Sequence, residues 1–340
     1  MRIPATGILV LLACACSSPV TPDGTPTAPL TPIDLKTALS SKFDAFAIPA
    51  GAACSISISQ QGQVVLERGR GNIASGRAAD GDSLYRIASL TKPFTAAAAL
   101  ISEKAGRLSL ADKVNRYIEF SEPAPTIDEL IKHIPGLSNY TDTFAYQFGN
   151  QTPTTLENLL SLVKPWDGVK RYQYSNSHPV LTAAALQKVN GLRWEDIIQR
   201  DILGPAGMSR SSFAIPAASE SVGFPFASKT DSSWVMYGGG ITSTAADMNR
   251  FNQSLLSNRF GFGALENFDR SAGVTSFGMG SGVSGGDLRF THAGGLDTYS
   301  SFTSIFPADK SSIVVLCNSS NSPETLSIFV MGLRAILLGQ

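Results

Sequence analysis

The 340-residue chain predicts an α+β fold, in which both chain ends build one antiparallel sheet and a mostly helical lobe is inserted between them. Near the N-terminus, polar and apolar residues alternate strictly over residues 54–59, and a second run covers residues 64–68 after a Gln-Gln-Gly turn. This pattern is typical of a β-hairpin. Near the C-terminus, three short runs of strand type lie at 288–292, 300–306 and 312–317. We expect helices to flank the sheet that these five strands form.

Turn residues separate the C-terminal runs. Gly294-Gly295 and residues 307–310 are the expected turns. A closing apolar helix over residues 326–338 is too short to span a bilayer, so we expect it to cover the sheet.

The other helices are predicted from apolar residues at helical spacing. Leu35, Leu39, Phe43 and Phe46 define an opening amphipathic helix. The glycines at 238–240 predict a loop that enters a later helix. Helical segments broken by Pro and Gly fill the lobe between about residues 108 and 226, at 127–133, 156–163, 179–189 and 194–203.

Composition limits the class of protein. Hydrophobic residues make up 43% of the chain and charged residues 16%, with a formal net charge of zero. This suits one large domain of two lobes, expected over residues 33–340. Balanced charge gives no electrostatic reason to expect a nucleic-acid partner. The three histidines and four cysteines show no metal-ligand spacing, so we expect no metal and no cofactor.

Residues 1–16 have the character of a targeting segment. Arg2 precedes a short apolar run over residues 3–12, and Leu11-Leu12-Ala13-Cys14 resembles a bacterial lipobox. The expectation is a protein exported to the bacterial cell envelope, lipid-anchored at Cys14 and facing the periplasm or the exterior, with no other membrane contact. An ordinary cleaved signal peptide is the alternative, and lipidation of Cys16 also stays open. Residues 17–32 are rich in Pro, Thr and Ser, which suits a flexible tether.

Two cysteines remain beyond the export signal. Cys54 and Cys317 both lie in apolar, β-like runs, and an exported protein meets conditions that permit disulfides. A disulfide between them and two separate buried thiols are both compatible with the sequence.

Ser89 and Lys92 form a Ser-x-x-Lys motif at the start of a strong helix former, residues 94–105. A serine three residues before a lysine at a helix start places both side chains on one face, within reach of each other. The helix N-terminus adds positive potential where an oxyanion would form. A second Ser-x-x-Lys match, Ser161 to Lys164, runs into turn residues, so we expect Ser161 to be a surface residue.

Two further motifs follow in order, Tyr174-Ser175-Asn176 and His292-Ala293-Gly294. With Ser-x-x-Lys, their order and separation resemble the serine β-lactamase-like superfamily, most closely the branch of class C β-lactamases, serine DD-carboxypeptidases, D-aminopeptidases and related esterases. The resemblance covers about residues 33–338 and implies the β-lactamase/transpeptidase-like fold. Other matching stretches are 126–133, 202–208 and 239–247.

The resemblance implies a role for each catalytic residue. Ser89 would attack a carbonyl and form an acyl-enzyme. Lys92 would accept the serine proton, directly or by sharing it with Tyr174, which requires burial or cationic neighbours to favour the neutral amine. Tyr174 would pass a proton to the leaving group. His292 would take part in the active site.

The same resemblance implies how substrate is held. Asn176 would hydrogen-bond the acyl side chain and Lys92. The backbone N–H groups of Ser89 and Gly295 would form the oxyanion hole. Gly294 would keep the strand edge bare, so that a substrate can lie against it.

The chain departs from the family pattern at two places. Where many β-lactamases carry Lys-Thr-Gly, this chain has His-Ala-Gly, the version found in some DD-peptidases, D-aminopeptidases and esterases. The usual His-Thr-Ser-Gly stretch is His133-Ile-Pro-Gly here, a change that concerns only local loop geometry. We expect His133, on an apolar helical face, to be a packed structural histidine. For His178 a position lining the pocket is the less favoured alternative.

Together these features predict a serine hydrolase that acts through an acyl-enzyme on Ser89. The favoured substrates are D-amino-acid-containing peptides, as for a DD-carboxypeptidase or a D-aminopeptidase. A carboxylesterase, a β-lactamase and a non-catalytic penicillin-recognising module are the alternatives. If His292 binds a substrate carboxylate as a cation, activity on that substrate falls as the pH rises through about 6–7. Partners other than a small molecule or peptide are not expected, and the sequence leaves the oligomeric state open.

Overall fold

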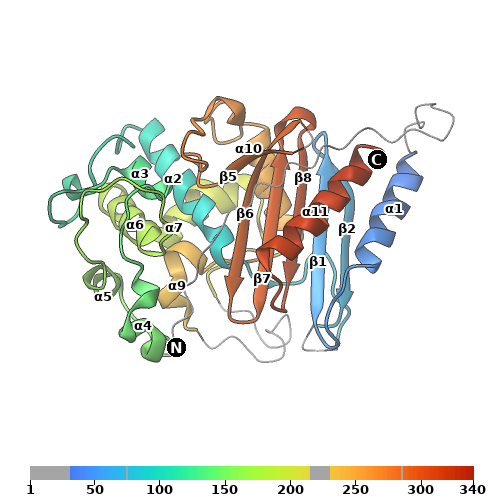
Figure 1. Cartoon of the computed structure of the whole chain (residues 1–340), viewed down its shortest axis with the longest axis horizontal. Coiled ribbons are helices and arrows are strands. Elements are labelled where there is room, and N and C mark those ends of the chain that lie inside the picture. Colours follow the sequence, from blue (N-terminus) through green and yellow to red (C-terminus); the bar gives the residue numbers. More distant parts are fainter. Residues whose placement is uncertain (1–30, 74–75, 215–229, 285) are drawn as a thin grey trace.

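The computed structural model describes residues 31–73, 76–214, 230–284 and 286–340 (Figure 1). The expected targeting segment, Cys14 and residues 17–30 of the tether lie outside the described residues. Among the described helices, none combines the length and the apolar character that crossing a bilayer requires.

One six-stranded antiparallel sheet organises the molecule, in the order β2-β1-β8-β7-β6-β5. The N-terminal hairpin therefore joins the C-terminal strands through the β1–β8 pair, and the predicted α+β class is confirmed. The strands are β1 (Ala53–Gln60), β2 (Gln63–Gly71), β5 (Gly280–Ser284), β6 (Asp287–Leu296), β7 (Tyr299–Phe306) and β8 (Ser311–Cys317).

Two features of the sheet differ from the sequence prediction. The edge strand β5 was not predicted, because its Gly-Ser-Gly-Val-Ser sequence lacks the apolar alternation of a strand. The prediction of a turn at Gly294-Gly295 is wrong, because both glycines lie within β6, opposite Ser301 and Ser300 of β7. The turn comes two residues later, at Asp297 and Thr298.

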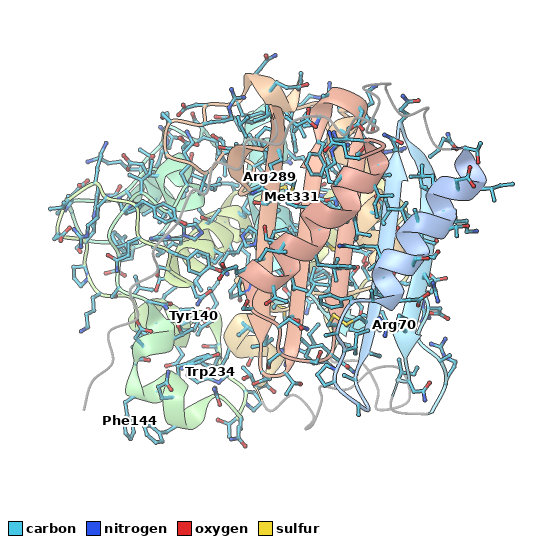
Figure 2. All side chains as sticks on the ribbon, turned by 45° about the vertical axis from the view of Figure 1, so that its right-hand side comes forward. Arg70, Tyr140, Phe144, Trp234, Arg289 and Met331 are labelled. Atoms are coloured by element: carbon cyan, nitrogen blue, oxygen red, sulfur yellow. A yellow bond between two sulfur atoms is a disulfide. The ribbon has the colours of Figure 1, made fainter. Side chains whose placement is uncertain are left out.

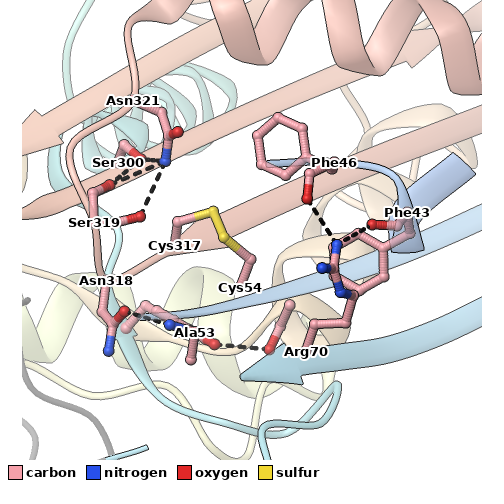
Figure 3. The surroundings of a disulfide bond; sticks show 12 residues. Phe43, Phe46, Ala53, Cys54, Arg70, Ser300, Cys317, Asn318, Ser319 and Asn321 are labelled. Carbon is pink, nitrogen blue, oxygen red and sulfur yellow. Dashed lines mark hydrogen bonds between the residues drawn. A yellow bond between two sulfur atoms is a disulfide. The ribbon is translucent and has the colours of Figure 1, made fainter. Parts of the chain in front are cut away.

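A disulfide ties the two chain ends together inside the sheet. Cys54 of β1 lies opposite Cys317 of β8, and the two sulfur atoms are bonded (Figure 3). Next to this bond, the Ala53 N–H donates to the Asn318 side chain at 2.7 Å. The Arg70 guanidinium donates to the carbonyls of Phe43, in the last turn of α1 (Pro32–Asp44), and of Phe46, just after it. The first strand is thus held on both of its sides.

Helices cover the two faces of the sheet. On one face, α1 and α11 (Pro323–Leu337) pack on an apolar cluster that includes Phe43, Phe306 and Phe329. On the other, α2 (Lys92–Lys104) and α10 (Ala245–Leu256) belong to the larger core. Hydroxyl side chains cap three of these helices: Thr31 caps α1, Thr244 caps α10 and Ser322 caps α11.

The helical lobe lies beside the sheet, on the side of β5 and β6 (Figure 1). Its helices are α3 (Ile127–Ile131), α4 (Phe144–Gly149), α5 (Leu156–Ser161), α6 (Ser177–Asn190), α7 (Trp194–Ile198), α8 (Gly204–Ala206) and α9 (Ser232–Gly239). Gly238 and Gly239 belong to the end of α9, so the predicted loop begins only at Gly240, and from there it leads into α10 as expected. β3 (Tyr85–Arg86), just before the Ser-x-x-Lys motif in sequence, pairs with β4 (Thr242–Ser243) in a small two-stranded sheet.

Candidate active site

Ser89 lies on η1 (Ala88–Thr91), a 3-10 turn that runs directly into α2. Ala88 adopts a positive φ of 51°, a conformation that is costly for a residue with a side chain. One turn further on, Lys92 Nζ lies 2.9 Å from Ser89 Oγ. The sharp bend before Ser89 and the helical spacing after it bring the two side chains together.

Lys92 is buried and held by two further oxygen atoms. Its Nζ donates to Asn176 Oδ1 at 2.9 Å and to the Gly238 carbonyl at 3.0 Å. Burial lowers the pKa of Lys92 from 10.5 to about 7. In the neutral amine both protons serve these two acceptors, which leaves the lone pair for the Ser89 hydroxyl proton. The surroundings therefore turn Lys92 into a base aimed at Ser89.

Tyr174 contacts the same serine from the other side. Its hydroxyl donates to Ser89 Oγ at 2.8 Å, and Lys92 Nζ lies 4.8 Å from the centre of its ring. Although 41% of the residue is exposed, desolvation of its hydroxyl raises the pKa of Tyr174 to about 12, so the phenol keeps its proton at neutral pH. A continuous hydrogen-bonded chain thus runs from Tyr174 through Ser89 to Lys92.

The two glycines of β6 bring a bare strand edge to Ser89. A Cβ on Gly294 would lie 2.6 Å from the Ile87 carbonyl and 3.0 Å from the Ser89 nitrogen, so only glycine fits. β5 pairs with β6 only as far as Thr291. Among the strands that the structure describes, none pairs with the outer edge of the later β6 residues. Leu296 and Tyr299 flank the two-residue turn, so their backbone groups bond to each other across the hairpin. Because successive residues of a strand point their N–H groups to opposite sides, the N–H of Gly295 points to the open edge.

The N–H groups of Ser89 and Gly295 therefore border the same pocket, as an oxyanion hole requires. This pocket has a solvent-accessible volume of about 80 Å³. Its wall consists of Ala88, Ser89, Tyr140, Thr141, Tyr146, Asn176, Val235, Gly238, Gly239, Gly295 and Leu296.

The far end of the pocket is aromatic. Tyr140 and Trp234 lie close together (Figure 2), and the Tyr140 hydroxyl donates to the Trp234 carbonyl. The Tyr146 ring packs edge-on against both. The Tyr140 hydroxyl has its hydrogen-bond acceptor within the lobe, and the residue also lines the pocket. The sequence prediction missed these tyrosines, since no motif marks them and they meet only through the fold.

His292 comes directly after Thr291, the residue of β6 at which the pairing with β5 ends. Its Nδ1–H donates to the Ala293 carbonyl at 2.7 Å, which leaves Nε2 with a lone pair. Burial and, second, the charge of Lys92 lower the pKa of His292 to about 4. The lowered pKa disfavours a charged ring at neutral pH, so His292 offers a hydrogen-bond acceptor there and not the cation that binding of a carboxylate would require.

The remaining predicted residues are placed as follows. Ser161 is exposed at the end of α5, and its hydroxyl donates to the Asn158 carbonyl, so the second Ser-x-x-Lys match is a surface feature. His133 lies beyond the end of α3 and not on a helical face, buried beside Tyr174. Within the part of the chain that the structure describes, no cluster of His, Cys, Asp and Glu could hold a metal ion.

Comparison with known proteins agrees with this geometry. Residues 45–328 match the Beta-lactamase family, which is most of the chain. The chain belongs to the beta-lactamase family. The resemblance predicted from the three motifs is thus confirmed, and at the level of the family the chain is a serine hydrolase.

Three similar proteins illustrate the range of this family. Penicillin-binding protein 4* of Bacillus subtilis is 25% identical over 299 residues, which cover 76% of this chain but 66% of that protein, less than two thirds of its length. A β-lactamase/D-alanine carboxypeptidase from Yersinia pestis has a TM-score of 0.75 at 20% identity, covering 89% of this chain and 99% of that one. D-amino acid amidase from Ochrobactrum anthropi has a TM-score of 0.74 at 18% identity, covering 90% and 99%. At these identities the two solved structures show the fold alone.

Proposed function

We propose that this protein is a serine hydrolase that forms an acyl-enzyme on Ser89 and acts on D-amino-acid-containing peptides or amides. The observation that carries the proposal is the hydrogen-bonded chain from Tyr174 through Ser89 to Lys92. Lys92 takes the serine proton as Ser89 attacks the carbonyl carbon, and Tyr174 delivers a proton to the leaving group. The N–H groups of Ser89 and Gly295 stabilise the oxyanion.

Within this class, the state of His292 favours an amide substrate of the D-aminopeptidase type over a DD-carboxypeptidase substrate. A neutral ring with a free Nε2 lone pair can accept from a substrate N–H. It supplies no positive charge for a free C-terminal carboxylate. The structural similarity to D-amino acid amidase from Ochrobactrum anthropi supports the same direction.

A carboxylesterase is the second candidate, because Tyr140, Tyr146, Val235 and Leu296 give part of the pocket wall an apolar character that suits an acyl chain. The deciding experiment compares D-alanyl-p-nitroanilide, its L-enantiomer, N-acetyl-D-Ala-D-Ala and p-nitrophenyl butyrate, each with wild type and with Ser89→Ala. Preference for the D-anilide, lost in Ser89→Ala, supports the proposal. Turnover of the butyrate alone would support the esterase, and full activity in Ser89→Ala would refute the mechanism.

Penicillin distinguishes the remaining alternatives. Mass spectrometry after incubation with a fluorescent penicillin shows whether Ser89 is acylated and whether the adduct persists. Rapid hydrolysis of the penicillin without a stable adduct would identify a β-lactamase. Stable acylation with no turnover of any other substrate would identify a non-catalytic penicillin-recognising module.

We also propose that the protein is a lipoprotein of the cell envelope, on the basis of Leu11-Leu12-Ala13-Cys14. Metabolic labelling with a palmitate analogue in a bacterial host tests this directly. Cys14→Ala should abolish the label and Cys16→Ala should keep it. The reverse result would assign the anchor to Cys16, and no label in the wild type would leave an ordinary signal peptide.

A further inference from the structure

Two of the three histidines of the chain are buried next to the catalytic tyrosine, although neither touches Ser89 in the structure. His133 and His178 are 6% and 1% exposed. Their Nδ1 atoms lie 2.5 Å apart, and the centre of the His133 ring lies 4.6 Å from that of Tyr174. His133 and Lys92 also share the wall of one small cavity.

The hydrogen bonds determine which nitrogen atoms carry protons. His178 Nε2 lies 3.1 Å from the Pro135 carbonyl, which can only accept, so Nε2 carries the proton. A neutral His178 then has a lone pair on Nδ1, and His133 Nδ1–H must donate to it. The opposite arrangement would use a contact of 3.4 Å from the Ser175 N–H to His133 Nδ1, which is too long to compete with one of 2.5 Å.

Both rings are uncharged at neutral pH. Burial lowers the pKa of His178 to about 3 and the pKa of His133 well below 6.5, and the positive charge of Lys92 lowers both further. A charged histidine here would oppose protonated Lys92 and would place two donors against each other. The neutral pair therefore satisfies both Nδ1 atoms, His178 Nε2 and the Pro135 carbonyl.

The backbone holds each histidine of the pair in place. His178 lies in the first turn of α6, while His133 follows α3 with a positive φ of 56°, which is costly for a histidine. The His133 carbonyl accepts from the Gln173 N–H at 2.8 Å, one residue before Tyr174. The side chain of His133 and its backbone thus both bear on the segment that carries the catalytic phenol.

We propose that the His133–His178 pair positions the Tyr174 phenol over Lys92 and against Ser89, and that this positioning is required for efficient acylation. The proposal rests on the acyl-enzyme mechanism proposed above. It also gives a physical account of the His-Ile-Pro-Gly sequence at 133–136: the Pro135 carbonyl anchors His178, and His178 in turn anchors His133. Neither histidine needs to exchange a proton with substrate.

Two substitutions of His133 separate its hydrogen bond from its bulk. His133→Phe keeps a ring against Tyr174 but cannot donate to His178. His133→Asn loses the ring, but its amide N–H2 can replace Nδ1–H, and asparagine tolerates the positive φ. With p-nitrophenyl butyrate we expect His133→Phe to lower kcat about 10- to 100-fold with KM changed less than about threefold. His133→Asn should stay within about threefold of wild type in both, because the hydrogen bond is kept.

The same change in a Tyr174→Phe background tests whether the pair acts through Tyr174. The measurement is the rate at which a fluorophosphonate labels Ser89, and single turnovers can be followed for hours. Because the fluoride leaving group needs no proton donor, this rate reports only how well the Tyr174 hydroxyl holds Ser89 Oγ in place for attack. We expect His133→Phe to slow labelling in the Tyr174 background and to have no further effect in Tyr174→Phe. Thermal unfolding of each variant checks that it is folded.

Several outcomes would overturn the proposal. Equal losses for His133→Phe in both backgrounds would mean a general structural role, and so would a His133→Asn variant as slow as His133→Phe. If the wild type is active and His133→Phe keeps the wild-type kcat, the positioning role is refuted while the proposed function stands. No Ser89-dependent labelling or ester hydrolysis in the wild type would overturn the proposed function, and this proposal with it.

Discussion

The lowered pKa of Lys92 predicts the pH dependence of the enzyme. If neutral Lys92 is the base, kcat/KM for an ester should rise with pH as the free enzyme loses this proton. With a pKa of about 7, roughly one tenth of the enzyme has the neutral amine at pH 6 and roughly nine tenths at pH 8. We therefore expect a rise of about tenfold between these values, followed by a plateau. A lysine with its ordinary pKa of about 10.4 would instead give a rise that continues beyond pH 9.

The assay is p-nitrophenyl butyrate hydrolysis from pH 5 to pH 10 at constant ionic strength. The three histidines cannot produce a rise near pH 7, because burial lowers the pKa of each: about 4 for His292, about 3 for His178 and well below 6.5 for His133. His292→Gln is the matched control, and it should keep the midpoint. A midpoint that moves with His292→Gln, or a profile that is flat from pH 5 to pH 9, would refute the assignment of Lys92 as the base.

Two further predictions concern the sheet. Gly294→Ala should lower kcat by about 100-fold or more, since its Cβ would collide with the Ile87 carbonyl and displace the Ser89 N–H from the proposed oxyanion hole. Gly282→Ala, on β5 with open space around it, is the control and should keep wild-type kcat; similar losses in both variants would contradict the steric argument. Replacing Cys54 and Cys317 by Ala should lower the free energy of unfolding by about 2–5 kcal/mol, measured by urea denaturation, because the bond closes a loop of 263 residues. Reductant should destabilise the wild type alike and leave the double variant unchanged; a loss below about 1 kcal/mol would show that the strand pairing alone holds the chain ends together.

The parts of the site that the sequence could predict are those with a local signal. Ser89 and Lys92 lie one helical turn apart, so their meeting follows from the start of one helix. The N-terminal hairpin was predicted for the same reason, since its alternation and its turn are contiguous in sequence. Tyr174 and His292 needed the resemblance to a family, because nothing in their own neighbourhoods relates them to Ser89.

What the sequence could not show depends on contacts through space. His133 and His178 are 45 residues apart in sequence and meet only in the folded chain. The pocket wall formed by Tyr140 and Tyr146 likewise depends on the packing of Tyr146, on α4, against Trp234, on α9. Gly294 was misplaced for a different reason. A glycine pair is the usual mark of a turn, but here the strand needs a residue without a side chain to pass close to Ser89.

The pairing of β1 with β8 has a consequence for how the protein is made. The first strand leaves the ribosome long before its partner, and the central contacts of the sheet must wait for nearly the whole chain. The oxyanion hole has the same dependence, because Gly295 comes about 200 residues after Ser89 along the chain. A partly synthesised chain therefore carries Ser89, the proposed nucleophile, without the strand that completes the proposed site, so we expect hydrolytic activity only once the whole chain has folded.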